Sequence, residues 1–112
     1  FDPSASLVVH VQNHLEPLVL LPAQEILLGR SEDGQSPLEG GLDLHPFGAA
    51  ECGVSRRHAL IRRGEDTLTL LDLGSTNGTY LNGQRLIPNQ PRVLRDGDEI
   101  RLGKLVLHVF FK

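Results

Sequence analysis

The feature that most constrains this chain is a series of short aliphatic runs separated by tight-turn dipeptides. The dipeptides end in glycine, which tolerates the positive φ of tight turns; they are Asp33-Gly34, Asn77-Gly78, Asn82-Gly83 and Asp96-Gly97. Within the last run, Leu105, Leu107, Val109 and Phe111 share one face while Val106, His108 and Phe110 share the other, as the period of two in a strand requires. Tight-turn dipeptides at such close spacing are hard to reconcile with helices, and they predict an all-β domain.

Strands are expected where β-branched and aliphatic residues cluster. The expected ranges are Leu7 to Val11, Leu18 to Leu21, Glu25 to Leu28, Ala59 to Arg63, Thr67 to Leu71, Val93 to Leu94, Glu99 to Leu102 and Lys104 to Phe111. Residues 1–17 are interpreted as an N-terminal segment and first strand of the same single domain, whose core spans residues 18–112. The 112 residues are an ordinary length for one domain.

Composition narrows the functional class. No uninterrupted apolar run reaches 18 residues and the first residues lack the pattern of a signal peptide, so we expect neither a membrane span nor a signal peptide within these residues. The single cysteine, Cys52, cannot form an internal disulfide, which favours a cytoplasmic setting. The formal net charge is −3, and the local group of Arg56, Arg57, Arg62 and Arg63 suits a small anion better than nucleic acid.

Three polar clusters stand at expected strand ends or turns: Gly29-Arg30-Ser31, Ser55-Arg56-Arg57-His58 and Gly74-Ser75-Thr76-Asn77-Gly78-Thr79. Together they supply a guanidinium fork, hydroxyl groups and turn N–H groups. A phosphoryl group carries about −1.5 to −2 charges on three acceptor oxygens and is well matched by such donors. Each cluster taken alone is equally compatible with a surface turn.

In this order, and followed by Asn82-Gly83 and Asp96-Gly97, the clusters resemble the forkhead-associated (FHA) domain family. The resemblance covers about Leu18 to Phe111. It implies a β-sandwich of two sheets and about eleven strands, with binding loops at one end. It also implies phosphothreonine-dependent docking in kinase signalling, where the partner is a phosphothreonine-bearing protein or another segment of the parent chain. No catalysis and no cofactor are implied.

Carried over position by position, the resemblance assigns the phosphopeptide to Arg30, Ser55, Arg56, Thr76 and Asn77. Arg30 and Ser55 bond the phosphate, Thr76 adds a donor, Arg56 assists, and Asn77 holds the main chain of the peptide. Structural support of the site falls to Gly29, His58 and Gly78.

The stretch from Ser31 to Val54 is longer than in many members of that family and is rich in glycine. Its last residues, Cys52 and Gly53, fall where family members select a residue beyond the phosphothreonine. They predict no strong selection by charge and a preference for an apolar side chain.

Two other classes of function stay open on the residues alone. A phosphorylation-independent interaction or oligomerisation module would use the same loops or a sheet face. A hydrolase would use Ser55 with His58 and Asp72, although no nucleophile signature surrounds Ser55. The five histidines lack the spacing of metal ligands, so no metal site is expected.

Overall fold

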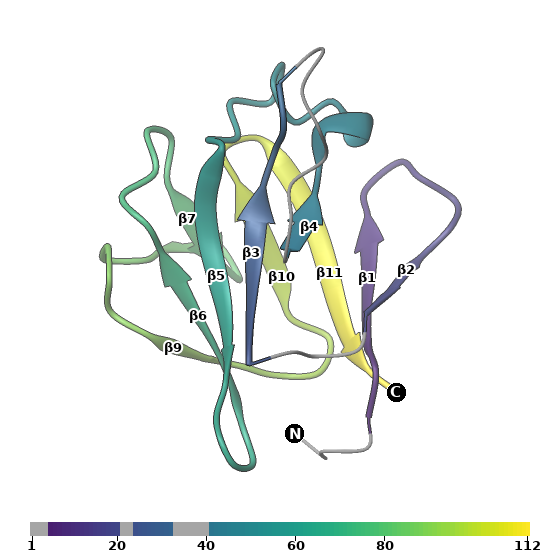
Figure 1. The fold of residues 1–112 in the computed structure, drawn as a ribbon, viewed down its shortest axis with the longest axis vertical. Coiled ribbons are helices and arrows are strands. Elements are labelled where there is room, and N and C mark those ends of the chain that lie inside the picture. Colours follow the sequence, from purple (N-terminus) through teal and green to yellow (C-terminus); the bar gives the residue numbers. More distant parts are fainter. Residues whose placement is uncertain (1–4, 21–23, 33–40) are drawn as a thin grey trace.

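The computed structural model describes residues 5–20, 24–32 and 41–112, and over these residues the chain forms two β-sheets (Figure 1). The first sheet has six strands in the order β2-β1-β11-β10-β7-β8. Their bounds are β1 Leu7–Val11, β2 Leu18–Leu20, β7 Thr79–Leu81, β8 Gln84–Arg85, β10 Glu99–Leu102 and β11 Leu105–Phe111. All pairs in this sheet are antiparallel.

The second sheet has five strands in the order β4-β3-β5-β6-β9. Their bounds are β3 Glu25–Gly29, β4 Gly41–Asp43, β5 Arg57–Arg63, β6 Leu68–Asp72 and β9 Arg92–Leu94. Only the β3–β4 pair is parallel among the pairs described. The prediction of an all-β sandwich of two sheets and about eleven strands is confirmed.

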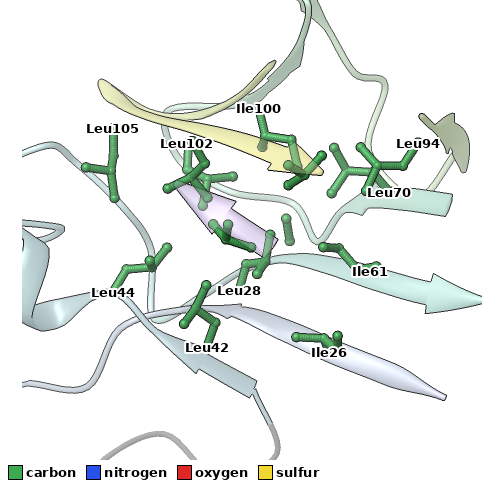
Figure 2. Packing of buried hydrophobic residues seen from close by; sticks show 14 of the residues in the cluster. Ile26, Leu28, Leu42, Leu44, Ile61, Leu70, Leu94, Ile100, Leu102 and Leu105 are labelled. Atoms are coloured by element: carbon green, nitrogen blue, oxygen red, sulfur yellow. The ribbon is translucent and has the colours of Figure 1, made fainter. Parts of the chain in front are cut away.

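The core lies between the two sheets, where side chains of β3, β5 and β6 face those of β10 and β11 (Figure 2). The core results from the alternation of side chains between the two faces of each strand. In β11, Leu105, Leu107 and Val109 are buried, whereas Val106 and His108 are only half-buried on the other face. Burying an aliphatic side chain of this kind contributes about 1.5–3 kcal/mol. The scaffold under the loops is therefore held by packing.

Three strands were not predicted from the sequence: β4, β7 and β8. Strand β4 is only three residues long, and it pairs in parallel with β3. Gly41 makes that pairing possible, because a Cβ at this position would stand 2.2 Å from the carbonyl oxygen of Leu27. Strands β7 and β8 flank the predicted Asn82-Gly83 turn with three and two residues. Leu21 and the predicted Asp33-Gly34 turn lie outside the described residues.

The loops that carry the polar clusters and the two chain ends lie at opposite ends of the longest axis (Figure 1). Ser6 and Lys112 exchange two main-chain hydrogen bonds of 2.7 and 2.9 Å beside the paired strands β1 and β11. The one helix in the described residues is the three-residue 3-10 turn η1, His45–Phe47. None of the described segments forms a helix with the length and apolarity needed to cross a membrane.

Candidate functional site

Three loops meet at the end of the sandwich remote from the chain ends (Figure 1). They follow β3, join β4 to β5 and join β6 to β7. The Ser55 hydroxyl accepts a hydrogen bond from the main-chain N–H of Thr76 at 3.3 Å, and this contact joins the second loop to the third. The N–H of Arg30 donates to the carbonyl of Arg56 at 3.2 Å, which joins the first loop to the second.

Gly29 sets the close approach of β3 to β5 at the start of the site. A Cβ on Gly29 would stand 1.9 Å from the carbonyl oxygen of Arg56, so no other residue fits without movement of the main chain. The register of the β3–β5 pair shifts between Leu28 and Gly29, because Leu28 pairs with Ala59 and Gly29 with Arg57, so that His58 is the extra residue on β5. This irregularity lies at the start of the site.

The guanidinium group of Arg30 is oriented by the neighbouring loop. Its Nε donates to the carbonyl of Val54 at 2.6 Å, and the residue is half-buried. This bond uses one of the five N–H donors of the fork and fixes its plane. Arg56 differs, because its side chain is 63% exposed and its Nε lies 3.2 Å from a carboxylate oxygen of Glu32.

His58 ties two loops together from below the site. Its side chain is fully buried, Nδ1 accepts from the N–H of Ser55 at 3.0 Å, and Nε2 donates to the carbonyl of Gly78 at 2.9 Å. Burial lowers the pKa of His58 and outweighs the raising effects of the Gly78 hydrogen bond and the charge of Asp72. The ring is therefore neutral, and both of its nitrogens are engaged by main-chain groups.

Asp72, at the end of β6, organises the third loop. Its carboxylate accepts hydrogen bonds from the N–H groups of Gly74 and Ser75 and from the hydroxyls of Ser75 and Thr79. Burial alone would raise the pKa of Asp72, but these four bonds, led by the two hydroxyls, lower it overall. Sequence reasoning considered Asp72 only as a hydrolase residue. An aspartate just before a Gly-Ser turn is itself the signal of a side chain that bonds nearby backbone N–H groups.

Asn77 stands at the tip of the third loop and reaches back to the second. Its Nδ2 donates to the carbonyl of Gly53 at 2.9 Å. Gly53 has φ of 79°, and a Cβ there would stand 2.5 Å from the same Nδ2 atom. The next residue, Gly78, is also left-handed, with φ of 87°. Glycine at both positions lets the two loops touch and presents the Asn77 amide at the surface.

A groove of about 380 Å³ opens beside Asn77. Its lining residues come from the second and third loops and from the β10–β11 turn, and they are Glu51, Cys52, Gly53, Asn77, Arg101, Gly103 and Lys104. The main-chain N–H of Lys104 donates to the carbonyl of Cys52 at 2.9 Å, which anchors the turn on the loop. Sequence reasoning placed neither Arg101 nor Lys104 in a site, because only the fold brings this turn to the groove.

The eight residues singled out from the sequence form one connected cluster at this end. Through the contacts above, Gly29, Arg30, Ser55, Arg56, His58, Thr76, Asn77 and Gly78 are all joined by hydrogen bonds or close approach. Their roles in ligand binding stay predictions. In the described part of the chain, no group of three or more histidine, cysteine or acidic side chains is arranged to hold a metal ion.

The chain is similar in sequence to a known protein family and to individual known proteins. The FHA domain family model matches residues 26–103. The chain is 50% identical over 106 residues to the oxoglutarate dehydrogenase inhibitor of Corynebacterium jeikeium, a match that covers 95% of this chain and 64% of that protein. It is 40% identical over 98 residues to protein FraH of a Nostoc species, covering 87% of this chain and 32% of that protein. The chain thus spans less than two thirds of either relative.

Among solved structures, the chain is similar to the N-terminal FHA domain of Rad53p from Saccharomyces cerevisiae, solved in complex with a phosphothreonine peptide. The TM-score is 0.70 at 26% sequence identity, and the match covers 96% of this chain and 94% of that one.

Proposed function

The chain belongs to the forkhead-associated (FHA) domain family, and from this premise we propose that it docks a phosphothreonine-bearing segment of a partner protein. FHA domains are binding modules, and a relative of this chain is named as an inhibitor rather than as an enzyme. The Rad53p domain to which the chain is similar holds a phosphothreonine peptide. The partner is a separate signalling protein or another segment of the parent chain, and the interaction is cytoplasmic.

The observation that carries the proposal is the convergence of unlike donors from three loops. Arg30, Ser55 and Thr76 stand on three loops that hydrogen bonds join at one end of the sandwich. A phosphate has three acceptor oxygens, so one donor from each loop matches it. Arg56 adds a second positive charge, and the exposed Asn77 bonds the main chain of the peptide beside the phosphate.

Preference for phosphothreonine over phosphoserine rests on one methyl group. Its transfer into an apolar niche is worth about 0.8 kcal/mol, or roughly fourfold in affinity. A larger preference requires that the methyl group also restrict the rotamer of the phosphate. Comparison of the two phosphopeptides therefore separates burial of the methyl group from restriction of its rotamer.

A hydrolytic role is disfavoured by the geometry at Ser55. A general base must reach the nucleophilic hydroxyl. The Nδ1 atom of His58 instead accepts from the main-chain N–H of Ser55, and Nε2 bonds the carbonyl of Gly78. Asp72 is engaged by four donors of its own loop, and the imidazole is oriented by main-chain groups instead. The proposed module therefore binds without turnover.

The test is a titration of the chain with a phosphothreonine peptide library and with its phosphoserine and unphosphorylated counterparts. A micromolar hit corresponds to about −8 kcal/mol. Arg30→Ala and Ser55→Ala should each weaken the best hit, the arginine variant by roughly 30- to 1000-fold, since charge-assisted hydrogen bonds contribute about 2–4 kcal/mol in sum.

Arg62→Ala is the matched control. Arg62 lies on β5 near the opposite end of that strand and pairs with Glu25 at 3.1 Å, so its loss removes one arginine without touching the site. This variant should bind like the wild type. Equal binding of unphosphorylated peptides, or full affinity in Arg30→Ala, would contradict the proposal and would favour phosphorylation-independent docking.

A further inference from the structure

One acidic side chain lies inside the cationic part of the site. A carboxylate oxygen of Glu32 is 3.2 Å from Nε of Arg56. The two side chains are 41% and 63% exposed, so solvent screens the pair and its own stabilising energy is small. Its position matters more than its strength, because Arg56 is one of the cations that face the proposed phosphate site.

The main chain just before Glu32 is anchored at the end of β4. The N–H of Ser31 donates to Oδ1 of Asp43 at 2.9 Å, and the same oxygen accepts from the N–H of His45 at 3.0 Å. The N–H of Leu44 in turn donates to the carbonyl of Gly29 at 2.8 Å. Glu32 therefore follows a segment anchored between β3 and the loop after β4, and its carboxylate is directed to Arg56 by the fold.

We propose that Glu32 competes with the ligand for Arg56 and thereby lowers the affinity of the site. In the empty site its carboxylate takes the place at Arg56 that a phosphate oxygen takes in the complex. A ligand gains from Arg56 only what exceeds this existing pair. A phosphate with nearly two charges displaces Glu32 and loses the full energy of the pair. A singly charged carboxylate attracts Arg56 no more strongly than Glu32 does, so it gains nothing further from Arg56. This inference rests on the proposed function.

The expected effect follows from the exposure of the pair. Exposed ion pairs of this kind are worth up to about 1 kcal/mol, so removing the competing charge should tighten phosphopeptide binding by about two- to fivefold. For a peptide with glutamate in place of phosphothreonine the gain should be no larger. Such a peptide can recover only its own interaction with Arg56, which is no stronger than that of Glu32.

The experiment titrates wild-type chain and Glu32→Gln with one phosphothreonine peptide and with its glutamate counterpart. Glu25→Gln is the matched control, because Glu25 on β3 forms a similarly exposed pair with Arg62 on β5 at 3.1 Å, and its substitution changes the net charge equally. Glu32→Gln should tighten both peptides, the glutamate peptide by no more than the phosphothreonine peptide. Glu25→Gln should leave both affinities unchanged.

A double-mutant cycle with Arg56→Gln tests whether Glu32 acts through Arg56. If Glu32 acts through Arg56, the gain from Glu32→Gln should shrink to less than half in the Arg56→Gln background. An equal gain in both backgrounds, weaker binding by Glu32→Gln, or the same gain from Glu25→Gln would each overturn the proposal. A wild-type chain that binds no phosphothreonine peptide would overturn the proposed function itself, and this inference with it.

Discussion

Replacing His58 with phenylalanine keeps an aromatic ring but removes both ring nitrogens, and it should destabilise the fold. The change removes two hydrogen bonds, one to the N–H of Ser55 at 3.0 Å and one to the carbonyl of Gly78 at 2.9 Å. An orphaned buried polar group costs about 1–3 kcal/mol. Gly78 is buried and carries the full cost, whereas Ser55 is half-buried and adds about 1 kcal/mol. The expected loss is therefore about 2–4 kcal/mol.

Urea unfolding measures this loss. With a slope of about 2 kcal/mol per molar, the midpoint should fall by roughly 1–2 M, which leaves a domain of ordinary stability folded. His108→Phe is the control, because His108 lies on the outer face of β11 with a 41% exposed side chain, 3.6 Å from a carboxylate oxygen of Glu99. It should change the unfolding free energy by less than about 0.5 kcal/mol. Equal losses in the two variants would refute the argument that His58 holds the loops through its nitrogens.

Three further outcomes are expected. Stability should fall as the pH drops from 6.5, the ordinary pKa of histidine, because burial lowers the pKa of His58 and the unfolded chain then binds a proton that the folded chain excludes. Urea titrations at pH 7.5 and 5.5 should show this difference, and His58→Phe should reduce it. Asp72→Asn should cost about 1–3 kcal/mol of unfolding free energy and weaken phosphopeptide binding, since one carboxylate oxygen that accepts loop donors becomes an amide; unchanged values would show that the loop does not depend on the charge. Arg30→Lys keeps the charge but loses the fork and the bond to Val54, so phosphopeptide affinity should stay at least about tenfold below wild type; full affinity would show that charge alone suffices.

Much of the scaffold could be predicted from the sequence because its long strands carry their own signal. Strands β1 and β11 alternate between buried and half-buried positions over five or more residues. Strand β6 is rich in buried aliphatic residues. Strand β4 carries no such pattern. It forms because Gly41 permits parallel pairing with β3, a contact between segments that are distant in sequence. Strands of two or three residues are too short for a periodic signal and depend on their partners.

The candidate site likewise contains residues that a local sequence pattern identifies and residues that only the fold brings together. Residues of the second and third loops were found because each cluster is contiguous in the sequence and matches a family pattern. Arg101 and Lys104 were not, since they reach the groove only when the β10–β11 turn packs on the carbonyl of Cys52. Glu32 was also missed, because it meets Arg56 only once β3 has paired with β5, and the two residues are distant in the sequence. Local sequence patterns thus identified the hydrogen-bond donors of the candidate site, whereas the charged side chains that lie beside these donors are seen only in the folded chain.

The pairing of Ser6 with Lys112 has a consequence for how this domain can be carried. Both ends of the described core leave the same side of a molecule whose longest extent is 36 Å, while the ligand loops occupy the other side. A short linker can join the two ends, so the domain tolerates circular permutation, or insertion into a surface loop of a host protein. In either arrangement the host attaches at one pole and the loops of the candidate site face the other, so the proposed docking function would make the unit suitable as a transplantable phosphorylation sensor.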